Sequence, residues 1–70
     1  MTMYSVVSSN IKCVGYDESS QTLGIIFKDG GSYEYRNVPE SVFNDLRLAS
    51  SVGKYFSQYI KDRYRCRKVR

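Results

Sequence analysis

The sequence predicts a small single-domain α+β protein in which an antiparallel three-stranded β-meander precedes two helices. Three observations indicate this class. The chain has only 70 residues, which leaves room for one hydrophobic core. Its first half holds strand-forming residues that alternate with a period of two and are separated by turn sequences. After its single proline, apolar residues instead recur at three- and four-residue steps, as they do in helices.

The three strands are expected at residues 11–17, 22–28 and 32–36. In the second of them, Leu23, Ile25 and Phe27 fall on one face, which we expect to face the core. Gly24 lies between them, where a glycine marks a bulge or the close approach of another segment. The glycines after the second strand suit a tight hairpin turn. The meander is therefore predicted from alternation and from turn chemistry together.

The two helices are expected at residues 40–49 and 51–62. Pro39 suits the first turn of the first helix. Ser50 and Ser51 can cap the second helix, and Gly53 in its first turn suggests close packing there, because glycine lowers helix propensity. Apolar stripes follow the helical period in both segments. They comprise Val42, Leu46 and Ala49 in the first helix and Val52, Phe56 and Ile60 in the second.

Charge divides the chain into unequal parts. Residues 61–70 hold six of the eleven Lys and Arg residues but one of the seven Asp and Glu residues, although the whole chain has a formal net charge of only +4. A basic end can bind phosphate or simply keep the chain in solution. We therefore expect an N-terminal segment at residues 1–7, a folded domain at residues 8–64 and a basic C-terminal tail at residues 65–70.

Several blocks of residues resemble the KTSC domain family. The blocks begin with Ser8-Ser9-Asn10-Ile11 and Val14-Gly15-Tyr16-Asp17, continue through Thr22-Leu23, Phe27, Gly31, Tyr33, Tyr35 and Val38-Pro39, and end with Ala49-Ser50, Gly53, Tyr55-Phe56, Ile60 and Tyr64. The resemblance implies a small α+β domain, which agrees with the pattern analysis. Members of the family are stand-alone bacterial and phage proteins or occur at the C-terminus of some lysyl-tRNA synthetases. That context suggests binding to nucleic acid such as tRNA, and it brings no catalytic residues.

From the composition we expect no enzymatic activity, no metal site and no cofactor. The chain has no histidine, so its hydroxyl and thiol groups lack the usual neutral-pH base, and zinc lacks a common ligand. Cys13 and Cys66 are too far apart for a CxxC motif, and we expect reduced thiols, with Cys66 in the tail. No apolar run reaches the roughly 20 residues of a membrane helix. We expect a cytoplasmic protein.

The expected function is non-specific binding of RNA or single-stranded nucleic acid. Cations that contact phosphates and aromatic rings that stack on bases would supply it, and both kinds of residue are interleaved at the end of the chain. The candidate nucleic-acid-binding residues are Lys54, Tyr55, Tyr59, Lys61, Arg63, Arg65, Arg67, Lys68 and Arg70.

The alternative is a protein-interaction or self-association module that does not bind nucleic acid. Exposed sheet edges and seven tyrosines on a small body favour it. A homodimer is compatible with either function. The polar triplet Ser8-Ser9-Asn10 is open to two interpretations, as a turn that satisfies backbone groups or as a small hydrogen-bonding site.

Overall fold

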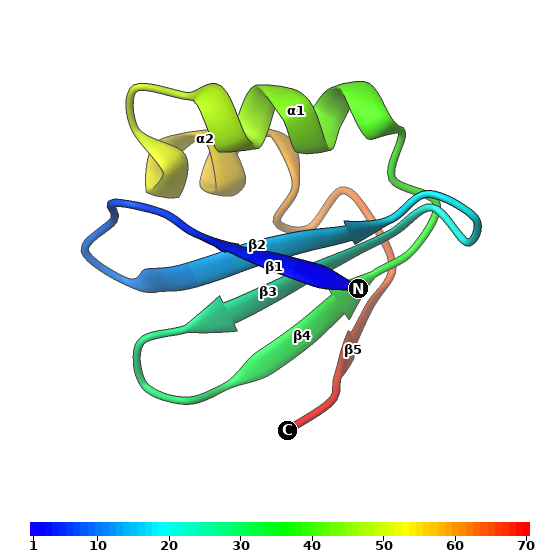
Figure 1. Cartoon of the computed structure of the whole chain (residues 1–70), viewed down its shortest axis with the longest axis horizontal. Helices are drawn as coiled ribbons and strands as arrows, with labels where there is room; N and C mark the ends of the chain where they lie inside the picture. The colour runs from blue at the N-terminus through cyan, green and yellow to red at the C-terminus, as the bar shows by residue number, and fades with distance from the viewer.

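The computed structural model describes all residues, 1–70, and contains one antiparallel sheet and two helices. The sheet has five strands in the order β1-β2-β3-β4-β5. Figure 1 shows both helices on one face of the sheet, so its other face is not covered by a helix. The elements in chain order are β1 (Thr2–Ser5), β2 (Ile11–Asp17), β3 (Thr22–Phe27), β4 (Ser32–Tyr35), α1 (Glu40–Leu48), α2 (Val52–Tyr59) and β5 (Cys66–Lys68).

The α+β class and the two helices are confirmed, but the prediction of three strands is wrong. The additional strands, β1 and β5, come from the segments that were expected to flank the domain. β1 pairs with β2, with Thr2 opposite Tyr16, and β5 returns after both helices to pair with β4, where Lys68 lies opposite Tyr33. Strands of four and three residues have too few alternating side chains to stand out in a sequence. Their partners, rather than their own composition, make them strands.

The core lies between the sheet and the two helices, as the strand alternation predicts. Leu23 and Ile25 are fully buried, whereas Ile26 is partly exposed. A β-bulge in β2, between Ile11 and Cys13, places Ile11 and Val14 on the same face although they are three residues apart. The buried hydrophobic residues are Ile11, Val14, Leu23, Ile25, Tyr35, Val38, Phe43, Leu46, Val52, Phe56 and Ile60.

Gly24 marks a close approach and not a bulge. The pairing of β3 with β4 runs without interruption from Leu23 to Ile26. A Cβ atom on Gly24 would lie 2.7 Å from the sulfur of Met1, because the side chains of Met1 and Met3 reach over this glycine. Of the two predictions made for Gly24, the close approach of another segment is confirmed and the bulge is wrong.

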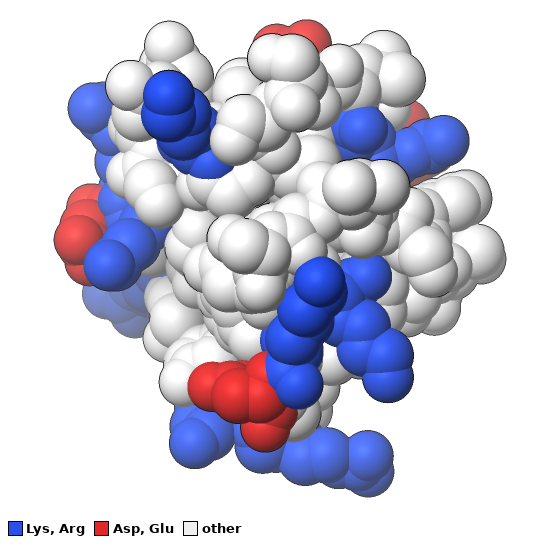
Figure 2. Space-filling view, turned by 90° about the vertical axis from the view of Figure 1, so that its left-hand side faces the viewer, with Lys and Arg blue, Asp and Glu red and all other residues white.

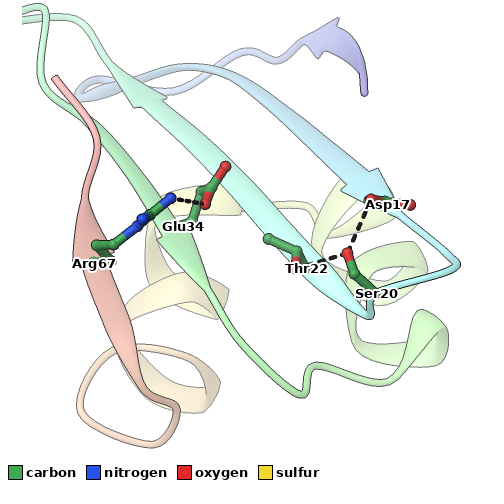
Figure 3. A network of polar contacts seen from close by, with 5 residues as sticks. All are labelled: Asp17, Ser20, Thr22, Glu34 and Arg67. Carbon is green, nitrogen blue, oxygen red and sulfur yellow. Dashed lines mark hydrogen bonds and ion pairs between the residues drawn. The ribbon is translucent and has the colours of Figure 1, made fainter.

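Short polar side chains close the connection between β2 and β3. Figure 3 shows Ser20 between Asp17 and Thr22, with its Oγ 2.9 Å from Oδ2 of Asp17 and 2.9 Å from Oγ1 of Thr22. Hydrogen bonds donated by Ser19 and Ser20 hold the pKa of the Asp17 carboxyl below its ordinary value. The sequence predicts this polar turn, and the structure adds its hydrogen bonds.

Of the two serines expected to cap α2, Ser51 is the cap. Its Oγ accepts a hydrogen bond of 3.3 Å from the backbone N–H of Lys54. α2 ends at Tyr59, three residues earlier than expected, and a turn with Asp62 at φ 64° leads the chain away. Neither helix is long and apolar enough to cross a membrane.

Because of three tyrosines, we expect the stability of the protein to change with pH in the alkaline range. Burial raises the pKa of Tyr16, Tyr35 and Tyr55, with added contributions from Glu40 at Tyr16, Cys66 at Tyr35 and Asp45 at Tyr55. Their ordinary pKa is near 10, so above that pH the unfolded chain releases protons that the folded chain keeps. We expect the free energy of unfolding to fall as pH rises above about 10. Urea titrations from pH 8 to 11 would measure this, and Tyr35→Phe should reduce the slope.

Candidate nucleic-acid interface

The predicted basic tail is the edge strand β5, and its side chains alternate between the two faces of the sheet. Cys66 lies opposite the buried Tyr35, so Cys66 and Lys68 share the helix side. Arg67 lies opposite Glu34 on the other side, where the two side chains form an ion pair of 3.1 Å. Figure 3 shows this pair on the face turned away from the helices. The cations of β5 are therefore held in fixed positions along one edge.

The remaining candidate cations are not gathered in one patch. Lys61 and Arg63 follow the end of α2, while Lys54 lies near its start. Arg63 donates a hydrogen bond of 3.0 Å from its Nε to the carbonyl oxygen of Gln58, which holds the chain after the helix. Figure 2 shows one face on which basic side chains stand in separate groups, with uncharged surface between them and acidic side chains beside some.

The two candidate tyrosines of α2 differ in accessibility. Tyr55 packs against the core, whereas Tyr59 is 52% exposed. Their ring centroids are 4.7 Å apart, so Tyr55 supports one side of Tyr59 and leaves the other side free. Tyr59 is therefore the more accessible of the two rings, while Tyr55 is partly buried.

A groove with aromatic walls lies between the end of α2 and the β4–β5 edge. Its volume is about 440 Å³. Three of its rings belong to a T-shaped cluster in which Phe56 lies 5.7 Å from Phe27 and 5.6 Å from Tyr35. Sequence analysis placed these rings in strands and a helix but could not show that they line one groove. The lining residues are Asn10, Phe27, Tyr33, Tyr35, Phe56, Ser57, Lys61, Asp62, Tyr64 and Cys66.

A second hollow, of about 690 Å³, is polar. It brings Ser8, Ser9 and Asn10 against the start of α2, and Lys54 is its one charged lining residue. A Cβ atom on Gly53 would lie 3.3 Å from Oδ1 of Asn10, which confirms the close packing predicted at this glycine. This polar hollow adjoins the aromatic groove, with which it shares Asn10 and Ser57, but Lys54 lines the polar hollow alone.

The triplet at residues 8–10 forms the turn that was one of its two interpretations. The Oγ of Ser8 accepts hydrogen bonds from the backbone N–H groups of Asn10, at 3.4 Å, and Ile11, at 3.2 Å. It also donates to Oδ1 of Asn10 at 3.1 Å. These contacts satisfy backbone N–H groups where β2 begins. The side chains of Ser8 and Asn10 therefore have a structural role in this turn.

Two of the sequence blocks that resemble the KTSC family thus meet in space: the block around Ser8 packs on the block around Gly53. A model of the KTSC domain matches residues 7–64. The chain belongs to the KTSC domain family. A crystal structure of a KTSC domain protein from Yersinia pestis has a TM-score of 0.95 and 36% sequence identity to this chain, and covers 99% of this chain and 97% of that one. The KTSC fold therefore includes β1 and β5, which both lie outside the matched residues.

Relatives of two kinds share this KTSC domain. A protein of Tsukamurella paurometabola is 41% identical over 63 residues, which cover 90% of this chain and 94% of the relative. The lysine–tRNA ligase of Nostoc punctiforme is 44% identical over 57 residues, which cover 81% of this chain but 10% of the ligase. The KTSC domain thus occurs as nearly the whole of one relative and as a small part of another.

Proposed function

We propose that this KTSC domain binds RNA or single-stranded nucleic acid weakly, with little sequence preference and without catalysis. The observation that carries the proposal is the position of the aromatic groove beside β5. Lys61 lines this groove, and so does Cys66, which is the first residue of the basic strand β5. Phosphates would follow the basic edge while a base enters the groove or stacks on Tyr59.

The free cations support the phosphate part of this proposal. Among the six basic residues at 61–70, only Arg67 forms an ion pair, with Glu34. The other five are exposed and carry like charges within ten residues. Such charges repel one another unless an anion neutralises them, so a phosphate backbone would lower that repulsion and release its counterions.

The aromatic rings support the part that concerns bases. Bases stack on exposed aromatic faces, and each stack contributes roughly 1–3 kcal/mol. Tyr59 offers such a face, and partly exposed Tyr33 and Tyr64 line the groove. The relative named lysine–tRNA ligase makes tRNA a reasonable first ligand to test.

The non-catalytic part of the proposal rests on composition. Without histidine the chain lacks the side chain that most often acts as a base near neutral pH. No group of three or more His, Cys, Asp and Glu side chains is placed to hold a metal ion. The site described above consists instead of cations and aromatic rings, which bind and stack.

A salt titration tests the proposal. If about three to five phosphates are neutralised, log affinity for a single strand should fall against log salt with a slope of roughly −2 to −3.5. Fluorescence anisotropy with a tRNA mixture and a short oligonucleotide, each at several salt concentrations, would measure it. The affinities for different sequences should be similar, because no groove-reading motif is present.

Substitutions then locate the interface. Arg65, Arg67 and Lys68 changed together to alanine should flatten the slope by about 2, since each contact contributes roughly 0.7 on single strands. Arg63 is left in place because its side chain holds the end of α2. The control Lys12→Ala with Arg47→Ala removes two cations near β1, one from β2 and one from α1 beside Tyr4, and should leave the slope nearly unchanged. Tyr59→Ala should cost about 1–3 kcal/mol of binding free energy if a base stacks there.

Two results would contradict the proposal. One is the absence of binding at low salt. The other is binding that changes the amide chemical shifts of β1 and β2 but not those of α2 and β5. Either would favour the alternative, a protein-interaction module.

A further inference from the structure

The outer edge of β1 is short, four residues, but it lacks the charges, proline and bulge that commonly protect an edge strand from pairing with another chain. Natural edges are usually guarded by charges, proline or bulges. Residues 1–11 contain no charged residue and no proline, and the pairing of β1 with β2 has no register shift. At the opposite edge, β5 is flanked and occupied by Arg65, Arg67 and Lys68. The two edges of the sheet therefore differ: β5 is guarded by charge and β1 is open.

The backbone of β1 presents donors and acceptors to this open edge. Val6 donates its N–H to the carbonyl oxygen of Lys12 at 3.3 Å, which fixes the alternation of an antiparallel pair. Residues 2, 4 and 6 therefore direct their backbone groups toward β2. The N–H and C=O groups of Met3 and Ser5 point outward, where no strand lies beside them.

We propose that β1 pairs with β1 of a second copy of the chain, antiparallel and centred on Tyr4. In this arrangement Met3 and Ser5 of one copy exchange backbone hydrogen bonds with Ser5 and Met3 of the second copy. The two Tyr4 residues lie directly opposite each other as a non-hydrogen-bonded pair, in which side chains are closest. The two sheets join into one of ten strands.

Side-chain positions suit this pairing. Tyr4 is 40% exposed although its ring lies 6.2 Å from that of Phe43 and 4.2 Å from the guanidinium carbon of Arg47. The ring is thus held in place on the helix side and retains a free surface for an aromatic neighbour. Met1 and Val7, which would lie opposite each other in the same register, are also exposed.

Charge favours a second copy at this edge in particular. The chain has a formal net charge of +4, so two copies repel each other overall. β1 and β5 are the outermost strands on opposite sides of the sheet. Pairing through β1 therefore joins the uncharged segments and keeps the two basic edges apart. The surface proposed for nucleic acid stays free, so this inference does not depend on the proposed function.

Disulfide trapping tests the register. Tyr4→Cys, in a background with Cys13→Ala and Cys66→Ser, should form a cross-linked dimer under mild oxidation, because opposed Cβ atoms in such a pair are near disulfide distance. Thr2→Cys in the same background is the control. Residue 2 would lie opposite residue 6 of the second copy, so little cross-linking is expected. Equal or faster cross-linking at position 2 would overturn the Tyr4-centred arrangement.

A second variant avoids the loss of the Tyr4 ring. Ser5→Pro removes an outward N–H that β2 does not use, and edge strands tolerate proline at such positions. Sedimentation equilibrium from micromolar to millimolar protein should show a monomer–dimer equilibrium for the unchanged chain. Ser5→Pro should raise the dimer dissociation constant at least about tenfold, whereas Ser5→Ala should not change it. A monomer at every concentration, or a Ser5→Pro variant that dimerises normally, would overturn the inference.

Discussion

Replacing Leu46 by alanine is expected to lower the free energy of unfolding by about 2–5 kcal/mol, which would leave much of the protein unfolded at room temperature. Leu46 is fully buried on α1 and belongs to the core of 11 residues. A domain of 70 residues has little stability to lose. The cavity left between the helix and the sheet would add to the lost burial of the side chain.

Urea denaturation followed by circular dichroism would measure the effect. Leu48→Ala is a matched control, since it makes the same change on the same helix at a side chain that is 81% exposed. Its expected effect is within about 0.5 kcal/mol. Similar losses in the two variants would show that α1 does not pack on the sheet through Leu46.

Gly15→Ala is expected to destabilise the protein by about 1–3 kcal/mol and to loosen β1 from the sheet. A Cβ atom at this position would collide with the sulfur of Met3 and would lie 2.6 Å from the backbone oxygen of Thr2. The methionine side chain can turn aside, but the backbone oxygen can move only if β1 shifts. Amide hydrogen exchange should therefore accelerate at Tyr4 and Val6, whose backbone groups point to β2.

Gly24→Ala is the matched control, because it adds the same methyl group to the same open face of the sheet. Its contact at 2.7 Å is with the sulfur of Met1, the far part of a flexible side chain at the end of the chain. The expected loss of stability is well below that at Gly15. A larger loss of stability for Gly24→Ala than for Gly15→Ala would contradict the position of β1 beside Gly15.

The aromatic groove shows why the candidate site was only partly predictable. The interleaving of cations with Tyr59 and Tyr64 is visible in the sequence, and Tyr33 and Tyr35 are visibly on one face of a strand. That these tyrosines approach Phe56 and Lys61 depends on how α2 crosses the sheet, which short-range patterns do not encode. The separation of Lys54 from the groove has the same cause, because a helix turns neighbouring residues in different directions.

The sequence by itself determined the central strands and both helices, and with them the core. Each of these elements carries enough periodic residues to bury one face, as Leu23 and Ile25 do in β3 and Phe56 and Ile60 do in α2. Tertiary structure alone decided the two edge strands and the sites beside them. Residues 2–5 and 66–68 become strands because β2 and β4 present unpaired backbone groups to them. Such hydrogen bonds join residues far apart in the chain and depend on no side-chain pattern, so only the folded sheet reveals them.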